Sequence, residues 1–204
     1  MYKLQFDGLF RKVEDKTHPG GKAGFMGYGW LIYKNGILTA RGHGVYMRGK
    51  DATSNVAEYL ALIEGLESLL DMGVYGEPVT VTGDAKSIID QMTGASAINA
   101  PALRPLYQRV KRIAVRLPQI TWTWTPRKDN HNADKLTRLA MRQVRANQSE
   151  YKKALQFLNE DLSGKKASKH LVSLLDLRIY QPMPAWLEPY PTPVTSSIPV
   201  MQFV

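Results

Sequence analysis

Four acidic residues in this chain could share a metal ion, because each stands at the end of an expected strand or helix: Asp7, Glu58, Asp84 and Asp134. If the fold brings them together, their mutual repulsion raises their pKa values, and a bound divalent cation relieves it. The chain has no cysteine and no paired histidines, so carboxylate oxygens favour Mg²⁺ or Mn²⁺ over zinc. Two such ions about 4 Å apart can stabilise both the attacking and the leaving oxygen of a phosphodiester. Acids at element ends are also common on plain surfaces, so spacing alone leaves that alternative open.

The element that carries Glu58 is a predicted helix from about Thr53 to Gly73. Either Thr53 or Ser54 can cap the free backbone amides of its first turn, where the helix dipole also favours a carboxylate. The apolar residues have the i, i+3, i+4, i+7 spacing of a helix with one buried face, at Val56, Tyr59, Leu60, Ile63, Leu66 and Leu70. Glu58 lies about a third of a turn off this stripe, so we do not interpret it as a core residue.

The remaining elements predict an α/β fold. Five strands are expected, over residues 3–8, 23–34, 37–47, 79–82 and 120–124. Further helices are expected over residues 86–92, 103–117 and from 134 to at least 144. Asn35-Gly36 is a strong hairpin signal between the second and third strands, and the later strands are reached through helices. This order predicts a mixed sheet of three antiparallel strands and then parallel ones, flanked by helices, with Asp7 and Asp84 at carboxyl ends of strands, where ligands gather.

Composition restricts the class of partner. The chain has 204 residues, with 21 basic and 13 acidic side chains up to position 145 and 6 and 5 after it. A basic domain commonly meets polyanions such as nucleic acid, although solubility alone explains the surplus equally well. There is no apolar run long enough to span a membrane and no secretory leader, and cysteine is absent, so we expect a cytoplasmic protein without membrane association.

Four motifs, in order across about residues 1–145, resemble those of type 1 ribonuclease H: Phe6-Asp7-Gly8, Ser54-Asn55-Val56-Ala57-Glu58-Tyr59, Thr82-Gly83-Asp84 and Arg127-x-x-Asn130-x-x-Ala133-Asp134. One such motif is weak, whereas four in order are specific. The resemblance implies a ribonuclease H-like five-stranded sheet. It also implies cleavage of the RNA strand of an RNA–DNA hybrid with two Mg²⁺ ions per site, or Mn²⁺, leaving 5′-phosphate and 3′-hydroxyl ends.

The resemblance also implies roles for individual residues. The four acids would be the catalytic metal ligands, with Asp7 shared by both ions and Glu58 near the 2′-hydroxyl next to the cut. The expected substrate-binding residues are Gly8, Thr53, Asn55, Arg127 and Asn130. Among these, Asn55 matches a minor-groove contact, Thr53 lies near a DNA phosphate and Arg127 assists the site. Contacts of this kind read shape and the 2′-hydroxyl, so little sequence preference is expected.

The chain also departs from many members of that family. His131 is only three residues before Asp134, too close to match the loop histidine of bacterial members, so the resemblance is to the histidine-less, archaeal-like branch and we interpret His131 as a surface residue. The basic protrusion with tryptophans is missing, and we interpret Trp30, Trp122 and Trp124 as core residues. Contacts to phosphates would then come from two basic helix faces. One face carries Lys135, Arg138, Arg142 and Arg145, and the other carries Arg104, Lys111, Arg112 and Arg116.

The resemblance leaves the C-terminal part of the chain unmatched, so we expect a catalytic domain over residues 1–146 and an extension over 147–204. Apolar spacing at Tyr151, Leu155, Leu158 and Leu162 predicts one more helix, and Ser168 could cap a short one through Leu175. From residue 182 onward six of the 12 prolines favour extended structure. We favour a strap packed on the catalytic domain over a swapped arm or a disordered tail.

Two other functions stay open at this point. One is a non-catalytic nucleic-acid-binding module on the same fold, and the other is a nuclease that also cuts double-stranded RNA. A DNA-cutting integrase or resolvase relative fits less well, because Asn55 and the residues around Glu58 resemble the hybrid-reading pattern. No obligate protein partner is evident.

Overall fold

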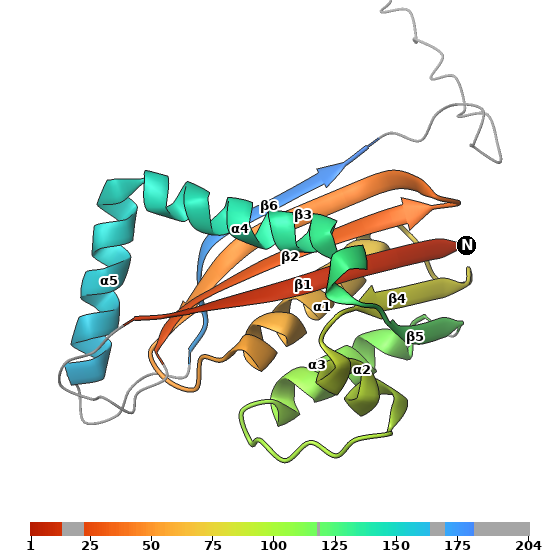
Figure 1. The fold of residues 1–204 in the computed structure, drawn as a ribbon, viewed down its shortest axis with the longest axis horizontal. Coiled ribbons are helices and arrows are strands. Elements are labelled where there is room, and N and C mark those ends of the chain that lie inside the picture. The colour runs from red at the N-terminus through yellow and green to blue at the C-terminus, as the bar shows by residue number, and fades with distance from the viewer. Residues whose placement is uncertain (14–22, 118, 164–169, 182–204) are drawn as a thin grey trace, which may run out of the picture.

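One mixed sheet organises the computed structural model, which describes residues 1–13, 23–117, 119–163 and 170–181. Its six strands run in the spatial order β5-β4-β1-β2-β3-β6 (Figure 1). Their bounds are β1 (Tyr2–Lys12), β2 (Gly24–Lys34), β3 (Ile37–Arg48), β4 (Val79–Gly83), β5 (Ile120–Trp124) and β6 (Val172–Tyr180). The predicted mixed sheet is therefore confirmed, with one more strand than the five expected.

The first strand is longer than predicted, and this changes where Asp7 lies. β1 continues to Lys12, so Asp7 is in the middle of the strand and not near its end. The parallel partner β4, however, pairs with β1 only from Tyr2 to Gln5. Asp7 therefore lies just beyond the parallel part of the sheet, which is the place where side chains from neighbouring strands become free to meet a ligand.

The hairpin between β2 and β3 confirms its sequence signal. Asn35 and Gly36 both have positive φ, 50° and 84°, as the turn type with two left-handed central residues requires. This turn sets the register of the two long strands, in which Lys34 faces Ile37. The register of β1 on β2 then places Asp7 directly opposite Gly29.

Helices cover both faces of the sheet. The helix bounds are α1 (Ser54–Asp71), α2 (Lys86–Thr93), α3 (Arg104–Ala114), α4 (His131–Ala146) and α5 (Gln148–Ser163), with a short 3₁₀ helix η1 at Arg127–Asp129. α1 packs on β1 and β2 with α3 against its outer side, and α4 crosses β1, β2 and β3 on the other face, in front of them in Figure 1. α4 begins three residues before the expected start, because the Asn130 carbonyl already accepts the amides of Ala133 and Asp134.

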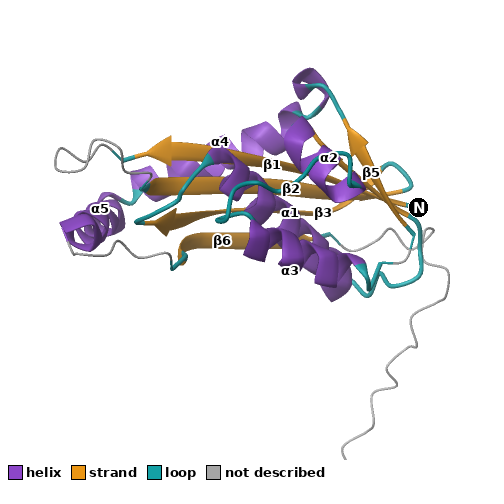
Figure 2. Cartoon of the chain, turned by 90° about the horizontal axis from the view of Figure 1, so that it is seen from below, coloured by secondary structure: helices purple, strands orange, loops and turns teal. Residues whose placement is uncertain are grey.

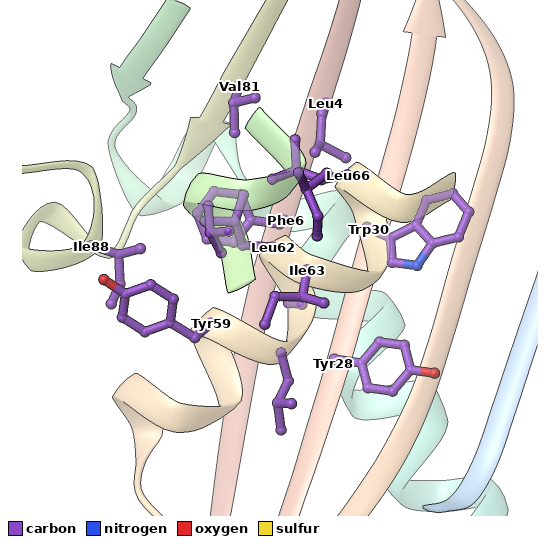
Figure 3. Packing of buried hydrophobic residues seen from close by; sticks show 14 of the residues in the cluster. Leu4, Phe6, Tyr28, Trp30, Tyr59, Leu62, Ile63, Leu66, Val81 and Ile88 are labelled. Atoms are coloured by element: carbon purple, nitrogen blue, oxygen red, sulfur yellow. The ribbon is translucent and has the colours of Figure 1, made fainter. Parts of the chain in front are cut away.

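The core lies between the sheet and α1. Leu4, Phe6 and Trp30 from β1 and β2 meet Leu62 and other residues of α1 in Figure 3. Trp30 is fully buried, as predicted, but the prediction of a core position for Trp124 is wrong, since its side chain is 46% exposed at the end of β5. The short β5 is an edge strand, so one face of its last residue is left uncovered.

The extension completes the opposite edge of the sheet. The expected helix is confirmed as α5, whose Ala154 and Leu158 are buried against β2 and β3 residues Phe25, Val45 and Met47. The prediction of a short helix ending near Leu175 is wrong, because β6 pairs antiparallel with β3, as the side-by-side strands of Figure 2 show. Residues from 182 onward, for which a strap is expected, and residues 14–22 of the first loop lie outside the described residues.

Polar contacts explain why β6 is a strand. Arg178 donates to the buried carboxylate of Glu64 on α1 at 2.6 Å and to Asp71 at 3.1 Å. The Tyr28 hydroxyl donates to Asp176 at 2.7 Å. Glu64 and Asp71 belong to α1 and Tyr28 belongs to β2, so these contacts stabilise the extended form of residues 172–180. β6 also satisfies the free backbone groups of the β3 edge.

Across the described residues, no helix has the length and hydropathy that a membrane crossing requires.

Candidate metal centre and nucleic-acid interface

Three of the four predicted acids meet at one place. Each of Asp7, Glu58 and Asp84 offers a carboxylate oxygen, and these atoms lie within 4.8 Å of one another. Asp7 and Glu58 are only 6% and 8% exposed, and Asp84 is half-buried. Three acids from β1, α1 and the end of β4 therefore lie together at a largely buried place, where little water screens their charges.

A glycine lets the first two acids approach. A Cβ atom on Gly8 would lie 2.2 Å from the Glu58 backbone nitrogen, so only glycine allows the first turn of α1 to lie against β1. The Gly8 amide also donates a hydrogen bond to the Glu58 carboxylate. Gly8 is predicted as a substrate contact. In the structure its missing side chain allows Glu58 to lie close to Asp7.

Asn130 holds the third acid. Its Nδ2 donates to Asp84 Oδ1 at 2.9 Å and to the Phe6 carbonyl at 2.8 Å. Because Asn130 is 1% exposed, these contacts tie the start of α4 to β1 and to the acid group. The indole of Trp124 adds a second tie, donating to the Asp84 carbonyl at 3.1 Å. The pattern of the sequence did not indicate this contact, since strict alternation in β5 gave no reason to distinguish Trp124 from a core residue.

The fourth acid lies apart from this group. Asp134 is held in ion pairs by Arg138 at 2.6 Å and by Arg127 at 3.1 Å. The hydrogen bond from Arg138 and the nearby Arg127 keep the pKa of Asp134 below its usual value. Asp134 is still within electrostatic range of the group, because its charge contributes to the raised pKa of Asp7.

The acid group is electrostatically strained. Burial, followed by the charges of Asp84 and Asp134, raises the pKa of Asp7 to about 7. Burial, followed by the charges of Asp7 and Asp84, raises the pKa of Glu58 well above its usual value. Glu58 Oε2 is also buried without a hydrogen-bond partner among the described residues. A cation would relieve the repulsion and satisfy that oxygen, and an all-carboxylate donor set suits a hard divalent ion. The residues present therefore fit a divalent metal.

A groove beside the first turn of α1 contains two of the predicted substrate residues. Thr53 and Asn55 line a cavity of about 560 Å³ together with Lys50, and residues 100–103 form its far wall. Thr53 is the N-cap of α1, and its hydroxyl oxygen accepts the Val56 amide at 3.2 Å. This confirms Thr53, and not Ser54, as the cap. The groove lies within one helical turn of Glu58.

A basic surface borders the acids on the other side. The Arg127 side chain is 70% exposed, and the predicted stripe of α4 is exposed along its length, at Lys135, Arg138, Arg142 and Arg145. His131 is also exposed and its Nδ1 lies 3.1 Å from the Lys128 carbonyl, which confirms the interpretation of His131 as a surface residue.

Sequence reasoning missed one buried residue in this place, Thr137. Its hydroxyl lies 3.2 Å from Asp7 Oδ2 and 2.8 Å from the Asp134 carbonyl. The available signal was its spacing, since a residue three positions after Asp134 lies on the same helix face.

Comparison with known proteins agrees with this geometry. Residues 22–140 match the family described as reverse transcriptase-like. A bifunctional protein of Mycobacterium tuberculosis is 33% identical over 129 residues, which make up 63% of this chain and 35% of that protein. The chain thus spans about a third of the length of this relative.

Two solved structures are similar over most of their length. RNase H1 of Halobacterium salinarum is 31% identical with a TM-score of 0.60, covering 70% of this chain and 98% of that one. LC11-RNase H1, solved in complex with an RNA/DNA hybrid, is 27% identical with a TM-score of 0.61, covering 71% of this chain and 99% of that one.

Proposed function

Since the chain belongs to the reverse transcriptase-like family of type 1 ribonuclease H proteins, we propose that it is an endonuclease that hydrolyses the RNA strand of RNA–DNA hybrids. The observation that carries the proposal is the buried meeting of Asp7, Glu58 and Asp84 within 4.8 Å. A protein that only binds nucleic acid gains nothing from carboxylates that repel one another and the phosphates of its ligand. The relative that was solved with an RNA/DNA hybrid supports the substrate class.

The proposed cofactor is Mg²⁺, with Mn²⁺ as a substitute, and two ions per site. Asp7, Glu58 and Asp84 would hold the metal, and Asp134 would join them once its carboxylate leaves one of its arginine partners. When bound there, such ions would supply an activated water and offset the charge of the scissile phosphate, and we propose that cleavage leaves 5′-phosphate and 3′-hydroxyl ends. Carboxyl groups must be deprotonated to bind a metal ion. The raised pKa values of Asp7 and Glu58 therefore oppose metal binding, and metal binding in turn favours loss of their protons.

The chain's own residues have separate tasks in this proposal. Asn130 and Gly8 are positioning residues and not substrate contacts, because Asn130 is buried and Gly8 faces the first turn of α1. Arg127, whose side chain is largely exposed, would meet a phosphate near Asp134. Thr53 and Asn55, in the groove beside α1, would contact the DNA strand and the minor groove of the hybrid.

The exposed basic stripe of α4 would hold phosphates further from the cut. Its residues recur every three or four positions on one helix face, at Lys135, Arg138, Arg142 and Arg145. From the first to the last of them, the stripe spans about 15 Å along the helix axis. Contacts to phosphates position a duplex without reading its sequence. We propose residues 1–146 as the catalytic domain and 147–204 as an extension, of which β6 joins the sheet and α5 packs against β2 and β3.

The test is cleavage of three labelled substrates side by side: an RNA–DNA hybrid, an RNA duplex and a DNA duplex. With Mg²⁺ or Mn²⁺ we expect cuts in the RNA of the hybrid, and loss of cutting in Asp7→Asn with the fold retained by circular dichroism. Exposed Asp129 provides a matched control, since Asp129→Asn removes the same charge outside the acid group. Binding of the hybrid without any cleavage by the wild type would favour the non-catalytic module, and cutting of the RNA duplex would widen the substrate range.

A further inference from the structure

We propose that Thr137 is a positioning residue of the metal centre, whose hydroxyl fixes the orientation of the Asp7 carboxylate for metal binding. This inference rests on the proposed function, because it concerns the same acid group. It goes beyond that function in assigning a role to a side chain that carries no charge and is not one of the four acids. Thr137 is completely buried, so its hydroxyl has no access to water as an alternative partner.

The backbone of α4 is held close to the sheet at this point by two glycines. A Cβ atom on Gly29 would lie 3.0 Å from the Thr137 nitrogen and 2.8 Å from the Ala133 carbonyl, and one on Gly27 would lie 3.2 Å from the Thr137 carbonyl. Since Gly29 is the cross-strand partner of Asp7, this close approach places the Thr137 side chain against the Asp7 carboxylate. The position of the hydroxyl is therefore set by packing and not by chance rotation.

The hydroxyl has one proton and two acceptors in reach. Oγ1 lies 3.2 Å from Asp7 Oδ2 and 2.8 Å from the Asp134 carbonyl of the preceding turn. A charged carboxylate is a stronger acceptor than a backbone carbonyl, so ionised Asp7 draws the proton. A carboxylate is planar, so fixing one oxygen also fixes where the other one lies. The hydrogen bond from Thr137 to Asp7 Oδ2 therefore stops the carboxylate from rotating and sets the direction of Oδ1.

Each acid of the group has a donor of its own. Gly8 donates to Glu58, Asn130 donates to Asp84, and Thr137 is the side-chain donor to Asp7 found among the described residues. Thr137 also links the first acid to α4, the helix that carries Asp134. Loss of this hydroxyl leaves the Asp7 carboxylate in place but free to rotate. Metal binding must then order the carboxylate, and this cost lowers the metal affinity.

The experiment is calorimetric titration of Mn²⁺ into the nucleic-acid-free full chain. Thr137→Val keeps the shape and removes the hydroxyl, and we expect Mn²⁺ affinity to fall about tenfold, as for loss of a hydrogen bond to a charged group. Thr137→Ser keeps the hydroxyl and should stay within about threefold of the wild type. Thr39→Val is the matched control, because Thr39 is also buried but donates to the Ile32 carbonyl on a neighbouring strand.

Cleavage of the hybrid gives a second readout. With limiting Mn²⁺ we expect Thr137→Val to cut slowly at an unchanged KM for the hybrid, and saturating Mn²⁺ to restore the rate. Wild-type Mn²⁺ affinity in a folded Thr137→Val variant would overturn the inference and leave the proposed function untouched. If Thr137→Val does not fold, a loss of Mn²⁺ affinity of about tenfold or more in Thr137→Ser overturns the inference, because that variant keeps the hydroxyl. Mn²⁺ affinity of Thr137→Ser within about threefold of the wild type supports it. Failure of the wild type itself to bind Mn²⁺ would overturn the proposed function and this inference together.

Discussion

Replacing Asp7 with asparagine should make the metal-free protein more stable, although it removes a residue proposed to be essential. The cause is the cost of holding a charged Asp7 in the buried acid group. Burial and the charges of Asp84 and Asp134 raise its pKa from 3.8 to about 7. A shift of about 3 pKa units, at about 1.4 kcal/mol per unit, sets a ceiling of about 4 kcal/mol on the free energy of unfolding that Asp7→Asn can recover at pH 8.

The pH dependence gives the sign of the effect. A carboxyl whose folded-state pKa is raised costs no stability below about pH 3.8, where it is protonated in both states. As the pH rises to about 7, the unfolded chain loses the proton first, so the free energy of unfolding falls by up to about 1.4 kcal/mol per pH unit. Above about pH 7 the full cost is present. Asp7→Asn removes this slope, and it also lowers the repulsion on Glu58, which acts in the same direction.

The assay is urea unfolding at pH 5 and pH 8 in a metal chelator. We expect Asp7→Asn to gain between about 1 and 4 kcal/mol over the wild type at pH 8 and clearly less at pH 5. Asp129→Asn, which removes an exposed acid, should change stability by less than about 0.5 kcal/mol at either pH. Equal stability of wild type and Asp7→Asn at pH 8 would refute the strained acid group, since an unstrained carboxylate costs nothing to keep.

Three further predictions concern the β6 edge, the basic stripe and the glycine contact. Arg178→Ala should lower the free energy of unfolding by about 3–5 kcal/mol in urea melts, because the buried carboxylate of Glu64 loses its ion-pair partner and keeps only the hydrogen bond from Tyr46. Arg109→Ala, at an exposed ion pair, should lower it by at most about 1 kcal/mol. Equal effects of the two substitutions would contradict the buried network. Substitution of both Arg142 and Arg145 with glutamine should weaken the salt dependence of hybrid binding, because two phosphate contacts are lost. The slope of log Kd against log salt for an RNA–DNA hybrid should fall by about 2, measured by fluorescence anisotropy in Ca²⁺. An unchanged slope would show that the α4 stripe is not part of the interface. Gly8→Ala should lower the free energy of unfolding by about 1–3 kcal/mol and abolish Mn²⁺ binding, because the added Cβ would force the first turn of α1 away from β1. Wild-type Mn²⁺ affinity in this variant would show that the turn can move without cost.

The elements that carry the acids could be predicted because each has a local signal. The i, i+3, i+4 stripe of α1, the Asn35-Gly36 turn and the short β-branched run of β4 all act over a few residues, and the structure has each of them. The acids of these elements also have fixed places relative to the element ends. The convergence of Asp7, Glu58 and Asp84 was expected from the resemblance and, for Asp84, from the end of β4. Asp7 lies inside β1, just beyond the part of β1 that pairs with β4.

What could not be predicted depends on contacts between distant segments. The sequence predicts a short helix capped by Ser168 and ending at Leu175, and the run from Leu171 to Leu177 is apolar enough for either form. Its strand form depends on the free edge of β3 and on Glu64, which is over 100 residues away in sequence. The inward position of Asn130 is of the same kind, since its partner Phe6 is 124 residues away. No local pattern reports such partners.

The central claim is that Asp7, Glu58 and Asp84 form one divalent metal site. The most direct test is anomalous diffraction from crystals of the unsubstituted protein grown with Mn²⁺ and without nucleic acid, so that all three acids are present and no substrate is cleaved. We predict an anomalous peak in contact with the carboxylates of Asp7, Glu58 and Asp84. A well-ordered acid group with no peak between these side chains, or with Mn²⁺ bound only elsewhere on the surface, would contradict the account.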